Sequence, residues 1–230
     1  MTNTVKKDLV ILLHGICRKG SSMLPVELYL KNAGYDVMNI TYPANKMTLE
    51  QLTDDLHDQI AASSQFNAAA NIHFVTHSMG GLLTRYYLSK HRPANLGRVV
   101  MMGPPNTGSE FADFMLENET LRPLFEAVFG PAGGQLRADY THAAETMKID
   151  YEVGVIAGTL SINPLAPHVL GNTPHDGIVP VSKTVIEGMK DHILLPATHT
   201  MMMYNWKVLK EIGEFLSNGK FSAASKRLEL

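Results

Sequence analysis

The chain has 230 residues, of which 45% are hydrophobic and 18% are charged, and its formal net charge is −2. This composition is globular and excludes a disordered or fibrous chain, and the length supplies one sizeable core rather than two. A net charge this close to zero gives no broad electrostatic field, so we expect no nucleic acid partner. The single cysteine, Cys17, leaves no internal disulfide to stabilise the fold.

The first apolar run, Leu9 to Leu13, follows a polar N-terminal segment. The run is too short for the core of a signal peptide or for a membrane span. We therefore expect a cytoplasmic protein with no stable membrane insertion. A secreted protein whose signal peptide had been removed would begin in the same way, so that alternative stays open.

Short apolar runs alternate with longer helical patterns along the chain. The first run is continuously apolar, which is typical of a strand covered on both faces of a parallel sheet. Thr48, with Gln51 three residues later, predicts a capping box at a helix start. The alternation predicts one α/β domain over residues 1–230, with about six mostly parallel strands and helices on both faces. The predicted strands cover residues 8–14, 35–42, 71–76, 97–102, 151–157 and 192–196, and the predicted helices cover 48–64, 79–91 and 201–216.

The segment 107–147 interrupts this rhythm because it is long for a connection in a compact domain. Its apolar residues include Phe111, Phe114, Phe125 and Phe129, and part of it has a helical apolar face. One interpretation is a crossover helix that buries this face on the sheet. The other is a small lid-like insert over an active site, and the sequence favours neither.

Ser78 stands between a predicted strand and a predicted helix and is followed by Gly80 and Gly81. This is the context of a nucleophile elbow, a sharp turn that projects a serine hydroxyl from the carboxyl edge of a sheet. Small residues around the turn let the strand and the helix approach each other. The usual pattern has a glycine two positions before the serine, where this chain has Thr76. An ordinary turn is the alternative.

Three segments directly follow predicted strands: His14-Gly15-Ile16, His77-Ser78-Met79-Gly80-Gly81 and Gly103-Pro104-Pro105-Asn106-Thr107-Gly108-Ser109. In combination they resemble the α/β-hydrolase lipases and esterases, most closely the small bacterial members. The resemblance covers roughly residues 9–216. It implies the α/β-hydrolase fold and a serine hydrolase activity.

This family builds its oxyanion hole from two backbone N–H groups. The resemblance implies Met79, the residue after the serine, as one donor, and Ile16, in the loop after the first strand, as the other. Such donors stabilise the negative oxygen of the tetrahedral intermediate, and losing one typically costs about 10²–10³ in rate. For His14 and Gly15, a plain strand-ending turn is the alternative.

A serine hydroxyl needs a base, and in this fold the acid and then the histidine follow the serine along the chain. His199 follows the last predicted strand, at the carboxyl edge where Ser78 also lies. We therefore predict His199 as the base, with a helix-capping histidine as the alternative. His91, His142 and His192 instead fall on a helix end, in the insert and at the wrong end of a strand.

The acid is expected in the loop after the strand that precedes the base. Asp176, followed by Gly177 and an apolar segment, resembles the acid loop of the family, and we predict Asp176 in this role. Asp191 is the runner-up, but it precedes the last strand and so faces the other edge of the sheet. An ordinary turn residue is the other alternative for Asp176.

The resemblance implies acyl transfer to water through an acyl-enzyme intermediate. We predict a carboxylesterase that acts on short- to medium-chain acyl esters, with a small-molecule ester as its partner. The alternatives are a lipase for long-chain acylglycerols with transient contact to a lipid surface, a thioesterase or acyltransferase, and a non-catalytic binder of hydrophobic ligands. The sequence has no metal-ligand spacing and no phosphate-binding loop, so we expect neither metal nor cofactor. It indicates no oligomeric state.

Overall fold

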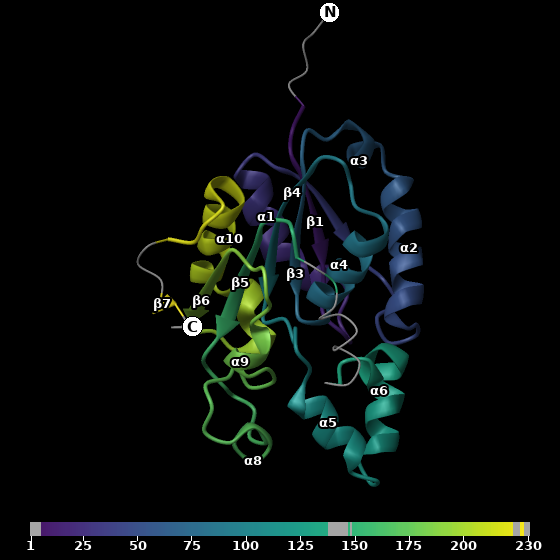
Figure 1. Ribbon diagram of the computed structural model, residues 1–230, viewed down its shortest axis with the longest axis vertical. Coiled ribbons are helices and arrows are strands. Elements are labelled where there is room, and N and C mark those ends of the chain that lie inside the picture. Colours follow the sequence, from purple (N-terminus) through teal and green to yellow (C-terminus); the bar gives the residue numbers. More distant parts are fainter. Residues whose placement is uncertain (1–5, 138–146, 148, 223–225, 228–230) are drawn as a thin grey trace, which may run out of the picture.

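The computed structural model describes residues 6–137, 147, 149–222 and 226–227. These residues form a seven-stranded sheet with the strand order β2-β1-β3-β4-β5-β6-β7. Figure 1 shows its strands running through the middle of the molecule. All neighbouring strands from β2 to β6 pair in parallel, as the sequence predicts, whereas the unpredicted β7 pairs antiparallel with β6. The strands are β1 (Leu9–Leu13), β2 (Asp36–Ile40), β3 (Ile72–His77), β4 (Leu96–Met102), β5 (Val153–Gly158), β6 (Asp191–Leu195) and β7 (Lys226–Arg227).

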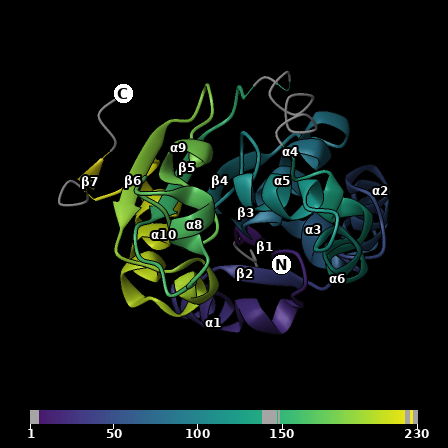
Figure 2. The same cartoon turned by 90° about the horizontal axis from the view of Figure 1, so that it is seen from below.

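Helices cover both faces of the sheet, and the side chains of β1 alternate between two cores. Leu9, Ile11 and Leu13 pack in the core beneath α2 (Leu49–Ala61) and α4 (Met79–Lys90). Val10 and Leu12 pack in the other core, beneath α1 (Leu24–Asn32) and α10 (Trp206–Asn218). Figure 2 shows the two helix layers on either side of the strands. A central strand covered on both faces has no polar side, which explains its continuous apolar run.

The capping box at the start of α2 is confirmed, because Thr48 Oγ1 accepts from the Gln51 N–H and the Gln51 side chain accepts from the Thr48 N–H. The predicted end of this helix at residue 64 is wrong. α2 stops at Ala61, and a short helix, α3 (Ser64–Ala68), follows it. The Ser63 hydroxyl accepts from the Phe66 N–H and so starts a second helix where the sequence predicted a continuous one.

The predicted final helix over 201–216 is also wrong at its start. A 3₁₀ helix, η2 (His199–Tyr204), precedes α10, which begins at Trp206. The Asn205 side chain accepts from the Lys207 N–H and caps α10. The chain therefore turns tightly directly after the last parallel strand, and His199 is the first residue of that turn.

The described part of the 107–147 insert forms two helices, α5 (Glu110–Glu117) and α6 (Arg122–Gly134). Gly130 interrupts α6 with a φ of 60°, and a Cβ there would lie 1.8 Å from the carbonyl oxygen of Asn45. Only glycine therefore allows this close approach. Residues 138–146 and 148 of the insert lie outside the described part, and the lid interpretation stays a prediction.

Four shorter helical elements complete the described fold, and no helix within the described residues is long and apolar enough to span a membrane. The elements are η1 (Gly20–Met23), which leads into α1, and α8 (Ala166–Leu170), α9 (Val181–Thr184) and the α3 already described.

The parallel strands all end at one edge of the sheet. In Figure 1 this edge faces down, where α5, α6 and α8 lie, whereas residues 6–8, which lead into β1, are at the opposite end. Loops at the carboxyl ends of parallel strands meet there, and open α/β sheets bind their ligands at this edge. The residues predicted to carry chemistry all follow strands that end here.

Candidate active site

Ser78 occupies a strained turn between β3 and α4. Its φ is 54° and its ψ is −125°, a conformation that non-glycine residues rarely adopt. A Cβ on Gly80 would lie 2.7 Å from the carbonyl oxygen of Leu13 and 2.9 Å from that of His14, so α4 starts directly against the end of β1. The sharp strand–turn–helix that the sequence predicts is present, and Gly80 is the residue that permits it.

Thr76, which departs from the usual elbow pattern, is fully buried within β3. It is in register with Leu13 of β1 on one side and Met101 of β4 on the other. Its hydroxyl lies 3.5 Å from the backbone oxygen of Val100. The branched side chain therefore occupies the strand without interrupting its pairing on either side.

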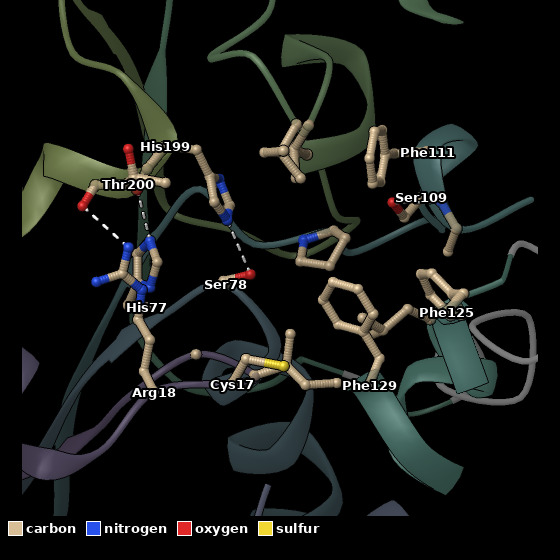
Figure 3. Close-up of a pocket in the computed structure, with 17 residues that line it drawn as sticks. Cys17, Arg18, His77, Ser78, Ser109, Phe111, Phe125, Phe129, His199 and Thr200 are labelled. Atoms are coloured by element: carbon tan, nitrogen blue, oxygen red, sulfur yellow. Dashed lines mark hydrogen bonds between the residues drawn. The ribbon is translucent and has the colours of Figure 1, made fainter. Parts of the chain in front are cut away.

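His199 lies between Ser78 and Asp176. Its Nε2 is 3.0 Å from Ser78 Oγ, the contact drawn in Figure 3, and its Nδ1 is 2.7 Å from Asp176 Oδ2. A carboxylate can only accept a hydrogen bond, so the ring proton belongs on Nδ1. The lone pair of Nε2 is then free to accept the hydrogen of the Ser78 hydroxyl. This is the relative geometry of a serine–histidine–aspartate triad.

The carboxylate of Asp176 is buried and held by its own loop. Its Oδ1 accepts from the N–H groups of Ile178, at 3.0 Å, and Val179, at 2.7 Å. The backbone oxygen of Asp176 accepts from the His199 N–H at 2.9 Å. Asp176 is therefore hydrogen bonded to His199 through both its side chain and its main chain.

The alternative acid, Asp191, lies elsewhere. It stands at the start of β6, at the opposite edge of the sheet, and pairs with Arg227 at 3.1 Å. Its second oxygen accepts from the Phe221 N–H. The structure therefore brings Asp176, and not Asp191, to the serine and the histidine.

The other candidate histidines in the described part of the chain, His192 and His91, contact residues other than Ser78. His192, at the start of β6, is hydrogen bonded to Thr184 at 2.8 Å, and burial lowers its pKa to about 4. His91 directly follows α4 and stacks on His57. His142 lies outside the described residues. Among the described residues, no group of three or more histidine, cysteine, aspartate or glutamate side chains is placed to hold a metal ion.

His77 is a site residue that sequence reasoning missed. Its Nε2 donates to the backbone oxygen of His199 at 2.9 Å, and the two rings lie 4.8 Å apart. Burial, with smaller effects from His199 and Arg18, holds the pKa of His77 well below its usual range. A neutral His77 thus fixes the loop that carries His199. Its only sequence signal was its position directly before Ser78.

The two predicted oxyanion donors belong to segments that meet at Ser78, because a Cβ on Gly15 would lie 3.1 Å from Ser78 Cβ. Met79 is the first residue of α4, where a backbone N–H has no acceptor within its own helix. Ile16 lies in the turn after β1 and lines the cavity. His14 fixes that turn. Its Nδ1 donates a hydrogen bond to the backbone oxygen of Gly15 at 2.8 Å, and its ring stacks on Tyr42 with the ring centroids 4.1 Å apart.

A cavity of about 390 Å³ opens onto Ser78 and His199. Its volume falls within the usual range of small-molecule sites. α5 and α6 supply a group of phenylalanines on one side of Ser78, and Arg18 lies on the other side (Figure 3). The cavity is lined by Gly15, Ile16, Cys17, Arg18, His77, Ser78, Pro105, Ser109, Phe111, Ala112, Phe125, Phe129, Leu136, Ile178, Val179, His199 and Thr200.

Three solved structures are similar to this chain in fold. The mature lipase BlEst2 of Bacillus licheniformis has a TM-score of 0.70 at 16% identity, with 86% of each chain covered. A metagenomic carboxyl esterase, MGS0156, has a TM-score of 0.71 at 17% identity, with 86% of this chain and 66% of that chain covered. Phospholipase PlaB of Legionella pneumophila has a TM-score of 0.63 at 16% identity, with 85% of this chain and 53% of that chain covered.

At such identities these likenesses show the fold, which is that of the α/β-hydrolases. The chain spans about half the length of the Legionella phospholipase. No curated protein sequence matches the chain. A model of the palmitoyl protein thioesterase family, however, matches residues 9–145, more than half of the sequence. The chain therefore belongs to the palmitoyl protein thioesterase family and is a serine hydrolase.

Proposed function

We propose that this protein hydrolyses short- to medium-chain acyl esters, with Ser78 as nucleophile, His199 as base and Asp176 as the acid that orients it. The observation that carries the proposal is the position of His199, 3.0 Å from Ser78 Oγ and 2.7 Å from Asp176 Oδ2. The three side chains come from three separate loops, so their alignment is a property of the fold. All three open onto, or lie directly behind, the apolar cavity.

In the first half of the reaction, Ser78 Oγ bonds to the acyl carbon while its proton passes to His199 Nε2. The carbonyl electrons move to the oxygen, which accepts from the N–H groups of Ile16 and Met79. The bond from carbon to the leaving oxygen then breaks, and the leaving alcohol takes the proton from His199. Asp176 stays ionised and stabilises the transient imidazolium.

In the second half, water attacks the acyl-enzyme and gives a proton to His199. The bond between the acyl carbon and Ser78 Oγ breaks, and His199 returns the proton to the serine. The products are a carboxylic acid and the free enzyme. The oxyanion donors act in both halves because each passes through a tetrahedral intermediate.

The cavity supports the proposed chain length. Its volume of about 390 Å³ lies near the lower end of the range for small-molecule sites. Phe125 and Phe129 line its apolar side and stack with ring centroids 4.5 Å apart. We infer that these two rings limit the length of the acyl chain. Short and medium acyl chains are therefore favoured over long ones.

Thioester hydrolysis is the second candidate, because the matching family is one of palmitoyl protein thioesterases. The same three residues and the same intermediate would serve, with a thiol leaving in place of an alcohol. The acyl side of the site would be unchanged, so the leaving group alone separates the two candidates.

Initial rates on two matched series test the proposal. The series are p-nitrophenyl esters from acetate to palmitate and thioesters of the same acids with one neutral thiol. We expect the largest kcat/KM at short to medium chains below the solubility limit, and the ratio between the series identifies the preferred leaving group. Activity confined to long chains in emulsion would favour a lipase instead. No hydrolysis in either series would refute the proposal.

A further inference from the structure

A second cavity, of about 670 Å³, adjoins the first, because Cys17 and Arg18 line both. It runs between the loop after β1, the loop after β2 and the outer side of α6. We call it the cationic groove. It is lined by Cys17, Arg18, Lys19, Thr41, Tyr42, Pro43, Ala44, Asn45, Lys46, Ala127 and Val128.

The cationic groove carries three positive side chains: Arg18, Lys19 and Lys46. Its described lining contains no aspartate or glutamate, and neither does that of the catalytic cavity. None of the three cations forms an ion pair with a carboxylate among the described residues, whereas Lys31 pairs with Glu27 and Arg98 with Glu152. The positive charge of the groove is therefore available to a ligand.

Arg18 connects this charge to the reaction centre. It is half-buried, and its guanidinium lies beside His77, across Ser78 from the phenylalanines of α5 and α6 (Figure 3). Its Nη2 donates to the backbone oxygen of Thr200 at 3.1 Å, which leaves further N–H groups for other acceptors. An acyl chain placed among the phenylalanines would direct its leaving group towards Arg18.

We propose that the cationic groove binds a phosphate on the leaving-group side of the substrate, with Arg18 nearest the scissile bond and Lys19 and Lys46 further out. The inference rests on the proposed function and names its substrate class: acyl esters or thioesters whose leaving group carries phosphate. Arginine suits this task because its planar fork donates two parallel hydrogen bonds to a phosphate. The phosphate belongs either to a water-soluble thiol carrier or to a phospholipid headgroup.

The competing explanation is that Arg18 only ties the loop after β1 to the loop of His199 through Thr200. Such a structural role would affect every substrate equally. The useful quantity is therefore a ratio, kcat/KM for a phosphate-bearing substrate divided by kcat/KM for a neutral substrate with the same acyl group. Arg18→Gln removes the charge but keeps an amide donor for the Thr200 oxygen.

The ratio is measured in two arms. One compares octanoyl-coenzyme A with the octanoyl thioester of N-acetylcysteamine, and the other compares dispersed dioctanoyl phosphatidic acid with dioctanoylglycerol. Lys46→Gln is a second, exposed test variant. Lys6→Gln is the control, because it makes the same change in net charge before the amino end of β1, away from the carboxyl edge that carries the site.

We expect the wild-type ratio to exceed one in at least one arm, and that arm identifies the source of the phosphate. Arg18→Gln should lower this ratio about tenfold and Lys46→Gln several-fold, whereas Lys6→Gln leaves it unchanged. Raising the salt concentration from about 0.05 to 0.5 M should lower the wild-type ratio as well.

A wild-type ratio near one in both arms, or equal ratios for Arg18→Gln and Lys6→Gln, would overturn the groove as a phosphate site. Hydrolysis of the neutral thioester by the wild type, and its loss in Ser78→Ala, would leave the proposed function standing in that case. If the wild type hydrolysed none of the four substrates, the proposed function would fail and the inference with it.

Discussion

At the scale of single residues, the site depends on how two side chains are held. Asp176 is fixed by two backbone N–H groups, and His199 is fixed by Asp176 and by His77. The proximity of Ser78, Asp176 and His199 could be predicted because the order of such residues along the chain is a rule of the fold. The roles of His77 and Arg18 could not be predicted, because they depend on contacts with a loop more than a hundred residues away.

Asp176→Asn tests the role of the acid. The amide nitrogen can turn towards His199 and hold the ring in the wrong tautomer, so kcat should fall about 10⁴-fold with little change in the fold. Asp191→Asn is the matched control, since Asp191 pairs with Arg227 at the other edge of the sheet and its variant should keep kcat within about twofold of the wild type. A larger loss of kcat in Asp191→Asn than in Asp176→Asn would refute this assignment.

At the scale of elements, α6 has one face shared between the core and the cavity. Phe125 is buried in the core beneath α4, Phe129 is half-buried against it, and both line the cavity. The sequence predicted an apolar helical face in 107–147 but could not decide what that face covers. A crossover helix and a lid bury the same residue types, so composition cannot separate them.

Phe129→Ala tests whether α6 limits the acyl chain. Removing the ring extends the apolar side of the cavity, and two further buried methylenes would favour the longer ester by roughly tenfold. We expect the ratio of kcat/KM for decanoate to that for butyrate to rise by about this factor. Leu124→Ala, an exposed position on the same helix, should leave the ratio unchanged. Equal ratios in the two variants would mean that α6 does not set chain length.

Two elements that the sequence analysis missed, α1 and β7, give weak local signals for different reasons. α1 presents only two buried residues, Val26 and Leu30, to the core, so its helical periodicity is weak. β7 has only two residues and pairs with β6 across a long interval of sequence. By contrast, the six parallel strands are predictable because most of them are apolar runs that end at a glycine or proline.

At the scale of the whole molecule, several histidines are buried without charge. Burial lowers the pKa of His14, His73, His77 and His192, the last to about 4. Between pH 6.5 and about 4, the unfolded chain therefore binds protons that the folded chain does not. The free energy of unfolding is greatest above this window and falls as the pH falls through it.

His192→Gln isolates one part of this acid sensitivity. A glutamine amide can still donate to the Thr184 hydroxyl but does not titrate. His192 alone should account for about 3 kcal/mol of the stability lost between pH 6.5 and 4. The free energy of unfolding, measured by urea unfolding at a series of pH values, should fall less steeply with decreasing pH for this variant than for the wild type. His168→Gln, a change at an exposed histidine, is the control. The same dependence of unfolding free energy on pH in all three proteins would contradict the expectation.

The most direct test of the central claim is to find which atom forms the covalent intermediate. The wild type, Ser78→Ala and His199→Gln are treated with a fluorophosphonate, and intact mass and peptide mapping locate the adduct. We predict one adduct on Ser78 in the wild type, none in Ser78→Ala and much slower labelling in His199→Gln, together with a 10⁴–10⁶-fold loss of kcat in Ser78→Ala. An adduct on another residue, or a Ser78→Ala variant that still hydrolyses esters at the wild-type rate, would contradict the account.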